Sequence, residues 1–295
     1  MKVTSFGEVL WDDFPSGKVL GGAPLNVVVR LRALGADTAI ISCRGDDEDG
    51  EELLRQILSK QVNADLVQVC PDQATSLVKV SLDKGGSASY EIVYPCAWDR
   101  IRVQPEALQR VAESDAFIFG SLAARDEVSR ATLEQLLEHA KFKIFDVNLR
   151  KPHYDTDRLL AAMKKADMVK LNDDELYELA EIYGSPYHSI EQNIAYLAKL
   201  TGVETVVVTL GSHGAALYKG GELYRHSGFR VKVADTVGSG DSFLAGLTYK
   251  LLSYADPQEA VTFACALGAL VASRHGATPE ISLQEIEAFM SGTNA

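Results

Sequence analysis

The stretch DTVGSGDSFLAGL, residues 235–247, places two glycines, a serine and an aspartate directly before an amphipathic run. The apolar residues that follow recur at helical spacing, at Phe243, Leu244, Leu247, Leu251 and Leu252. This spacing predicts a helix whose first turn contains Asp241. The start of a helix has backbone N–H groups without partners and a partial positive charge, which suit a phosphate or a developing negative charge. Gly238 and Gly240 let the backbone come close to such a ligand.

A simpler interpretation of the same stretch is that Asp241 only favours the helix dipole and that the glycines form a turn. The local pattern supports both interpretations equally. The remainder of the chain has to decide between them.

Composition limits the classes of function. The 295 residues are 46% hydrophobic and 24% charged, which is ordinary for a soluble globular protein of one or two α/β domains. Acidic residues outnumber basic ones by 41 to 29, for a net charge of −12. Such a surface disfavours binding to nucleic acid, so an anionic ligand has to be held by local features.

The four cysteines lie far apart, with no CxxC pair and no histidine cluster nearby, which argues against a zinc site and against a disulfide framework. A reducing compartment fits this usage best. The first residues lack a secretory apolar stretch, and the most apolar run, residues 260–272, is too short to span a bilayer. We therefore expect a cytoplasmic protein without a membrane partner.

The C-terminal two thirds of the chain alternates between short β-rich runs and helical stretches such as residues 128–140 and 174–182. The β-rich runs are AFIFGSL, KFKIFDVNL, MVKLN and TVVVTLG. This alternation predicts βαβ units, a parallel sheet, and ligands at the carboxyl ends of the strands.

The N-terminal third differs. After VTSFGEVL comes a short segment at residues 18–20, and TSLVKVSLDKGGSASYEIVY later alternates in polarity about Gly85 and Gly86, which indicates a β-hairpin. These strands could form a small accessory sheet that covers a site, or only an edge hairpin.

The chain lacks GxxxxGK[ST], GxGxxG after a strand, HRD and DFG, which disfavours P-loop enzymes, dinucleotide enzymes and protein kinases. It resembles instead the ribokinase-like (PfkB) carbohydrate kinases, in which a motif of the form DTxGAGD begins the catalytic helix. Five further segments match that family in order and spacing: GEVLWD at 7–12, GGAPLN at 21–26, GDDEDGEEL at 45–53, LNDDE at 171–175 and VTLGSHG at 208–214. The resemblance spans nearly the whole chain. It implies one domain, residues 1–295, with a three-layer α/β/α sandwich, a central mostly parallel sheet and a small β lid near residues 11–21 and 74–99.

The resemblance makes Asp241 the catalytic base, with the backbone of Gly238, Ser239 and Gly240 as the anion hole. Transfer of a phosphoryl group to a sugar requires removal of the hydroxyl proton, and a carboxylate beside an anion hole suits that step. The family usually has alanine at position 239. Because the hole consists of N–H groups, a serine should leave it working.

Asp12 stands just past the first predicted strand, at the sugar-binding aspartate of the family, although Asp13 beside it is a rival for that position. Gly21, Gly22 and Asn26 resemble the turn that contacts the sugar; Asn26 can both donate and accept hydrogen bonds, or can simply start a helix. Arg150 could meet the sugar or the transferred phosphate, or only a surface acid.

In NDDE the resemblance implies that Asn172 and Glu175 help to hold the water shell of the Mg²⁺ bound with ATP, which prefers hard oxygen ligands. The same four residues are also typical of an ordinary helix N-cap. Asp235 is expected to help order a monovalent cation such as K⁺, together with carbonyls near residues 273–276.

The nucleotide phosphates and ribose are expected at Thr209, Gly211 and Gly214, although TLGSHG could be simple turn chemistry. Cys265 falls where relatives contact adenine. A buried cysteine is the safer interpretation there, because its surroundings are apolar.

The resemblance therefore implies an ATP-dependent sugar kinase. GEVLWDDFP and GGAPLN look like fructokinases, so we expect fructose phosphorylated at its 6-hydroxyl beneath a lid hairpin with Tyr90, Tyr94 and nearby Trp98. The alternatives are a ketodeoxygluconate or ribose kinase, and a non-catalytic sugar- or nucleotide-binding regulator of the same fold. A homodimer through the lid is a further expectation.

Overall fold

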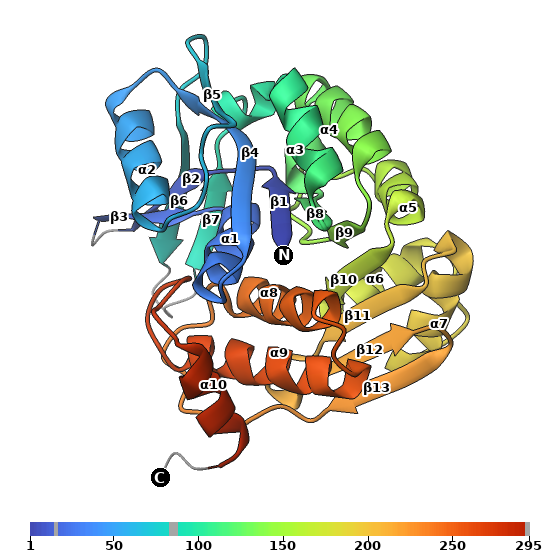
Figure 1. Cartoon of the computed structure of the whole chain (residues 1–295). Helices are drawn as coiled ribbons and strands as arrows, with labels where there is room; N and C mark the ends of the chain where they lie inside the picture. The colour runs from blue at the N-terminus through green and yellow to red at the C-terminus, as the bar shows by residue number, and fades with distance from the viewer. Residues whose placement is uncertain (15–16, 83–87, 293–295) are drawn as a thin grey trace.

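A nine-stranded sheet forms the centre of the molecule (Figure 1). The computed structural model describes residues 1–14, 17–82 and 88–292. The strands lie in the order β13-β12-β11-β10-β9-β8-β1-β4-β5. Their bounds are β1 (Lys2–Phe6), β4 (Asp37–Gly45), β5 (Val67–Cys70), β8 (Ala116–Gly120), β9 (Lys143–Asp146), β10 (Met168–Asn172), β11 (Thr205–Thr209), β12 (Ala215–Lys219) and β13 (Glu222–His226). The strands from β11 to β5 in that order are parallel, and β12 and β13 are antiparallel, which confirms the predicted mostly parallel sheet.

Helices cover both faces of this sheet. One layer contains α1 (Ala23–Ala33), α8 (Ser239–Leu252) and α9 (Pro257–Ala272), with α10 (Leu283–Met290) packed on α9. The other contains α3 (Pro105–Glu113), α4 (Glu127–His139), α5 (Thr156–Lys165), α6 (Asp173–Ile182) and α7 (Ile190–Thr201). The remaining helices are α2 (Glu48–Ser59) and the short 3-10 turns η1 (Ala97–Arg100), η2 (Leu122–Ala124) and η3 (Gly211–His213). None of the described helices has the length and apolar character that a bilayer-spanning segment requires.

The strand sequences explain the two layers. In β8, Ile118 packs into the core beneath α8 and α9, whereas Phe117 and Phe119 pack into the core beneath α3 to α7. A strand buried on both faces reads as a continuous apolar run, as AFIFG does. Several helices begin at side chains that accept backbone N–H bonds, such as Asp126 for α4 and Asn172 for α6. The predicted helices 128–140 and 174–182 therefore lie within a residue of α4 and α6.

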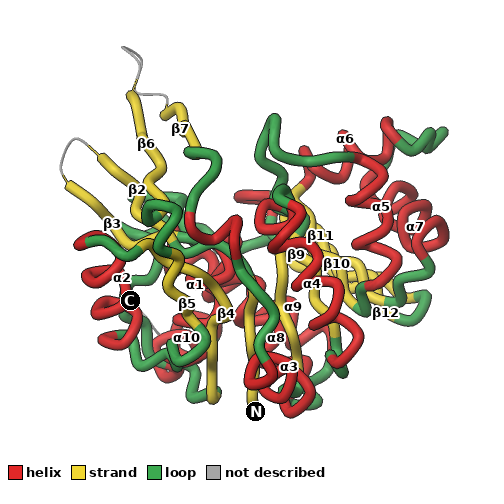
Figure 2. The backbone as a smooth tube through the Cα atoms, turned by 90° about the horizontal axis from the view of Figure 1, so that it is seen from above, coloured by secondary structure: helices red, strands yellow, loops and turns green. Residues whose placement is uncertain are grey.

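A second sheet of four strands lies to one side of the first, as Figure 2 shows. Its order is β3 (Gly17–Gly21), β2 (Leu10–Phe14), β6 (Ser76–Leu82) and β7 (Ala88–Ile92). Strands β6 and β7 are antiparallel, as predicted for the hairpin, although its Gly85-Gly86 turn lies outside the described residues. We call these four strands the lid sheet.

The first strand is shorter than its sequence predicts. Strand β1 ends at Phe6, and Gly7 takes a φ of 148° in a position where a Cβ would lie 2.7 Å from the Pro24 side chain. The run VTSFGEVL therefore divides between the two sheets. Asp12 lies in the middle of β2 and not just after the first strand of the central sheet.

Candidate active site

The first turn of α8 lies at the centre of the site. Helix α8 begins at Ser239 after Gly238, whose φ is 73°. A Cβ on Gly238 would lie 2.3 Å from the Ala277 carbonyl oxygen, so this glycine is required by the packing of two backbone segments. The Ser239 hydroxyl donates to the Gly268 carbonyl in α9 at 3.0 Å. The N–H groups of Gly240 and Asp241 come too early in the helix to have a helical acceptor, which leaves them available to an anion.

Asp241 is held from a distant helix. The Asn26 amide in α1 donates to Oδ2 of Asp241 at 2.8 Å, across 215 positions of sequence. Burial raises the pKa of Asp241 to about 6, and the charge of Asp146 adds to this, while Lys170, Asn26 and Arg150 oppose it. The structure therefore brings Asn26 to the predicted base itself.

The Lys170–Asp146 ion pair was not predicted from the sequence. Lys170 of β10 lies opposite Asp146 of β9, and its ammonium donates to the two carboxylate oxygens at 2.9 and 3.2 Å. Burial lowers the pKa of Lys170, but Asp146, Glu175 and Asp241 raise it by more, so the net shift is upward and the ammonium keeps its charge. A signal was present: Lys170 is a charged residue within the apolar run MVKL of β10, and Asp146 directly follows the apolar residues Ile144 and Phe145 of β9.

Asp12 faces a glycine on the neighbouring strand. A Cβ on Gly21 would lie 2.4 Å from Oδ2 of Asp12, so the absence of a side chain makes room for the carboxylate. Gly22 has another reason to be glycine: its φ is 114° and a Cβ would lie 2.3 Å from the Glu8 carbonyl oxygen. Burial raises the pKa of Asp12 to about 6, against the opposing charge of Arg150.

Glu8 is a second group that sequence reasoning missed. Its side chain is buried, and its Oε2 has no hydrogen-bond partner among the described residues. It lines a small cavity with Asp146, Asn148 and Ser121. Burial raises the pKa of Glu8 to about 7. The segment GEVLWD carries part of the family resemblance, but it gives Glu8 no role of its own.

Glu175 and Asn172 form a reciprocal helix cap. The Asn172 side chain accepts from the Glu175 N–H, and Oε2 of Glu175 accepts from the Asn172 N–H. Oε1 accepts from the Leu149 N–H at 2.8 Å, which fixes the segment after β9. A carboxylate oxygen keeps a further lone pair for water, so these hard donors fit Mg²⁺ held through its water shell.

Asp235 connects the motif to the loop after α9. Its Oδ1 accepts from the Val237 N–H and its Oδ2 from the Gly276 N–H, each at 3.0 Å. The structure thus joins Asp235 to the segment near residues 273–276 with which it was expected to order a cation.

The predicted nucleotide residues lie at the end of β11. Thr209 is opposite Asn172 in the sheet, and Gly211 has open space where a Cβ would be. Gly214, by contrast, would place a Cβ 1.9 Å from the His226 carbonyl oxygen, so local packing explains this glycine. Cys265 is buried in α9, where burial raises the pKa of its thiol to about 12.

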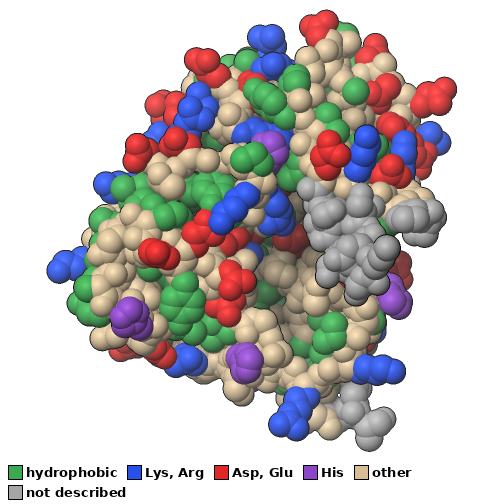
Figure 3. Space-filling view, turned by 180° about the vertical axis from the view of Figure 1, so that it is seen from behind, with side chains coloured by type: hydrophobic (Ala, Val, Ile, Leu, Met, Phe, Trp, Pro, Cys, Tyr) green, Lys and Arg blue, Asp and Glu red, His purple; other side chains and the backbone are tan. Residues whose placement is uncertain are grey.

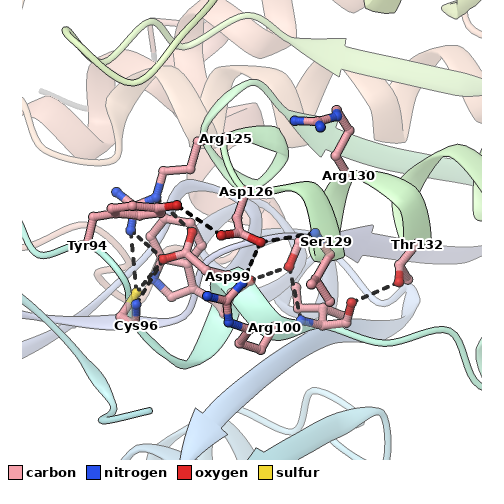
Figure 4. A network of polar contacts seen from close by, with 12 residues as sticks. Tyr94, Cys96, Asp99, Arg100, Arg125, Asp126, Ser129, Arg130 and Thr132 are labelled. Carbon is pink, nitrogen blue, oxygen red and sulfur yellow. Dashed lines mark hydrogen bonds and ion pairs between the residues drawn. The ribbon is translucent and has the colours of Figure 1, made fainter. Parts of the chain in front are cut away.

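The aromatic residues near the lid have structural partners. Trp98 is completely buried, with the Arg125 guanidinium 4.0 Å from its ring, so it does not line a sugar pocket. Figure 4 shows Arg125 paired with Asp99 and the Tyr94 hydroxyl bonded to Asp126. The side chain of Tyr90 lies outside the described residues.

A cavity of about 290 Å³ lies on the face of β8 and β9 that α4 and α5 cover, with Tyr94, Arg125 and Arg158 among its lining residues. It contains neither Asp12 nor Asp241. The predicted residues lie instead at the first turn of α8, on β2 and β3 of the lid sheet, at the start of α1, and at or just after the ends of β9, β10 and β11. Figure 3 shows charged side chains of both signs around a hollow on one face of the molecule.

Comparison with known proteins finds relatives that match nearly the whole chain. The model of the pfkB family of carbohydrate kinases matches residues 12–283. Fructokinase from Klebsiella pneumoniae is 31% identical over 94% of this chain and 94% of its own length. Fructokinase-2 from Solanum habrochaites is 30% identical over 95% of this chain and 92% of its own. The crystal structure of fructokinase from Vibrio cholerae O395, bound to fructose, ADP and calcium, superposes with a TM-score of 0.83 at 27% identity over 98% of both chains.

The family model covers the motif at residues 235–241 and the lid sheet from Asp12 onward. The chain belongs to the pfkB family of carbohydrate kinases.

Proposed function

We propose that the protein transfers the γ-phosphoryl group of ATP to the 6-hydroxyl of fructose. The observation that carries the proposal is the first turn of α8, where the Asp241 carboxylate, held by Asn26, stands beside N–H groups without helical acceptors. A hydroxyl placed between them can lose its proton to Asp241 as it attacks. The N–H groups of the turn then stabilise the charge on the transferred group.

Asp12 and Arg150 are proposed to hold the sugar. Asp12 comes from the lid sheet, and its carboxylate is bordered by the glycine at position 21, so hydroxyl groups can approach it. A carboxylate accepts from two adjacent hydroxyls, and a guanidinium donates to others. The likeness to fructokinases supports fructose as the sugar.

Mg²⁺ is proposed to be held through water by Glu175 and the neighbouring oxygens at the end of β10, where it would neutralise part of the charge of the ATP phosphates. The protein's own contribution there is to hold Glu175 rigidly through three hydrogen bonds. Asp235 is proposed to order a K⁺ ion beside the turn.

The test is release of ADP with a panel of sugars at saturating Mg·ATP. Fructose should give the highest kcat/KM, ahead of ribose, adenosine and ketodeoxygluconate. Buried polar groups matched to particular hydroxyls penalise an analogue that lacks them by about 1–3 kcal/mol per group. If ribose or ketodeoxygluconate led by tenfold, the sugar assignment would be wrong and the kinase assignment would stand.

Tight binding of a sugar without turnover of any sugar would instead favour a regulatory binding protein. The buried, raised-pKa Asp241 argues against this alternative, because a binding module has no need for a base.

We also propose that two copies associate through their lid sheets, in the cytoplasm. Strand β3 is an edge of the lid sheet, and Val19 on it is 43% exposed. The four cysteines are free thiols, which suits a reducing compartment. Light scattering after size exclusion should give twice the 32.0 kDa mass of the chain, and Val19→Lys should give the monomer.

A further inference from the structure

Lys170 is placed at the mouth of the proposed anion hole. A Cβ built on Gly240 would have the Lys170 Nζ as its nearest atom outside the helix, at 3.5 Å. Gly240 provides one of the N–H groups that lack a helical acceptor. An anion bound to that turn would therefore be close to a side-chain cation as well as to the helix start.

One N–H group of the Lys170 ammonium has no acceptor among the described residues. A lysine ammonium has three N–H groups, and two hydrogen bonds go to the oxygens of Asp146. No further acceptor for Lys170 is present among the described residues. The third N–H is thus available to a ligand, and the ammonium lies close to Gly240 in the first turn of α8.

The pair is also difficult to explain as a device for stability. Both side chains are buried, with 8% of Lys170 and 6% of Asp146 exposed. Apolar residues of similar volume usually stabilise a fold as well as a buried ion pair does, because desolvation offsets the attraction. A less buried ion pair lies near the opposite ends of these strands, where Lys143 at the start of β9 is 3.8 Å from Asp167, the residue before β10.

We propose that Lys170 is a catalytic residue whose ammonium contacts the γ-phosphoryl group of the nucleotide, while Asp146 orients it. The inference rests on the proposed kinase function and names the side chain that completes its anion hole. Lys170 would bind the γ-phosphate before transfer and stabilise its charge during transfer. Asp146 keeps the ammonium aimed at the turn when the nucleotide is absent.

The test compares binding of Mg·ADP with that of a non-hydrolysable Mg·ATP analogue, by calorimetry and without sugar. Lys170→Met should weaken the analogue by about tenfold or more relative to ADP, since only the analogue has a γ-phosphate. In turnover, kcat should fall by about 10²-fold to 10³-fold, as for other losses of a transition-state donor, with the KM for the sugar little changed. Lys143→Met is the matched control. It should change neither the affinity for the analogue relative to ADP nor kcat.

A second variant separates chemistry from folding. Lys170→Met leaves Asp146 buried without its partner, so the double variant Lys170→Met with Asp146→Leu replaces the whole pair by apolar side chains. It should fold at least as well as the single variant, judged by thermal unfolding, and should still lack the preference for the γ-phosphate. If either variant kept the wild-type ratio of analogue to ADP affinity, Lys170 would not contact the γ-phosphate. Since this readout needs no sugar, a wild-type protein that binds nucleotide but phosphorylates nothing would overturn the proposed function and leave the inference testable.

Discussion

At the residue scale, Asp241 shows how position gives a common side chain a chemical task. Its carboxylate is next to a helix start, receives one amide N–H from Asn26 and is affected by both charges of the Lys170–Asp146 pair. Asp241→Asn keeps the size and loses the ability to accept the proton. We expect kcat to fall by about 10²-fold to 10⁴-fold, with the fold intact.

The matched control for this change is Asp157→Asn, an exposed acid in the first turn of α5. It removes the same charge from a helix start that has no part in the proposed chemistry. Activity of Asp241→Asn within about threefold of the wild type would remove Asp241 from the mechanism.

The pH dependence belongs to the same scale. Burial raises the pKa values of Asp241 and Asp12 to about 6, and both are needed in the charged form. Activity should therefore be full above that range and fall as the pH drops through it, with two protons contributing to the loss of kcat/KM. The charged groups that act on Asp241 include Asp146, Lys170, Arg150 and Glu8.

The measurement is log kcat/KM against pH, whose slope should approach two on the acid side in the wild type. In Asp12→Asn the slope should be one, since Asp241 is then the only remaining carboxylate of the two that the proposed reaction needs in the charged form. A wild-type rate that stays constant down to pH 5 would contradict the assignment of Asp241 as a base that must be charged.

At the scale of the element, the two glycines at the start of α8 are expected to matter for different reasons, Gly240 for phosphate access and Gly238 for backbone packing. Gly240→Ala adds a methyl group that meets only the Lys170 Nζ, at an ordinary 3.5 Å, so we expect normal stability. The methyl group stands where a phosphate would approach the turn, and kcat should drop by about tenfold or more. Gly240→Val should abolish turnover.

Gly238→Ala is the contrasting change. At a φ of 73° and with the Ala277 carbonyl oxygen 2.3 Å from the new Cβ, it should lower the melting temperature by several degrees. Ser239→Ala should cost about 1 kcal/mol of stability through the bond to Gly268, with a mild effect on kcat. Should Ser239→Ala prove more harmful to turnover than Gly240→Ala, the hydroxyl would have a role in the reaction.

At the scale of the whole molecule, the site depends on two sheets. Asp241 and Lys170 belong to the central sheet and its helices, whereas Asp12 belongs to the lid sheet. Asp12→Ala should therefore lower kcat/KM for the sugar by about 2 kcal/mol, or about thirtyfold, and leave the affinity for ATP nearly unchanged.

Asp13→Ala is the control in this case, because successive side chains of a strand point to opposite faces. Asp13 shares its face of β2 with Trp11, which packs under α2, and lies opposite Lys18 and Lys79. Steady-state kinetics with each substrate varied in turn distinguishes the two aspartates. An equal loss in both variants would contradict the assignment of Asp12 as the sugar ligand.

The sequence by itself determined the elements and the motif. Runs such as AFIFG and TVVVT predict strands buried on both faces, and the glycines at 238 and 240 mark the start of α8, because periodicity and backbone preference are local properties. The parallel sheet, the antiparallel hairpin of β6 and β7 and the position of Asp241 in a first turn followed directly. The break at Gly7 did not, since it depends on contact with Pro24.

Only the tertiary structure decided which side chains meet. Asn26 reaches Asp241 because α1 packs against α8, and Lys170 reaches Asp146 because β9 and β10 are neighbours in register. The structure also made Glu175 the hydrogen-bond partner of the Leu149 N–H, and it buried Glu8 with an Oε2 atom that has no partner among the described residues. A charged residue in an apolar strand indicates that another group must compensate for the burial of its charge. The identity of the compensating group lies elsewhere in the chain, because strand order and helix packing are set by the whole core and not by the residues nearby.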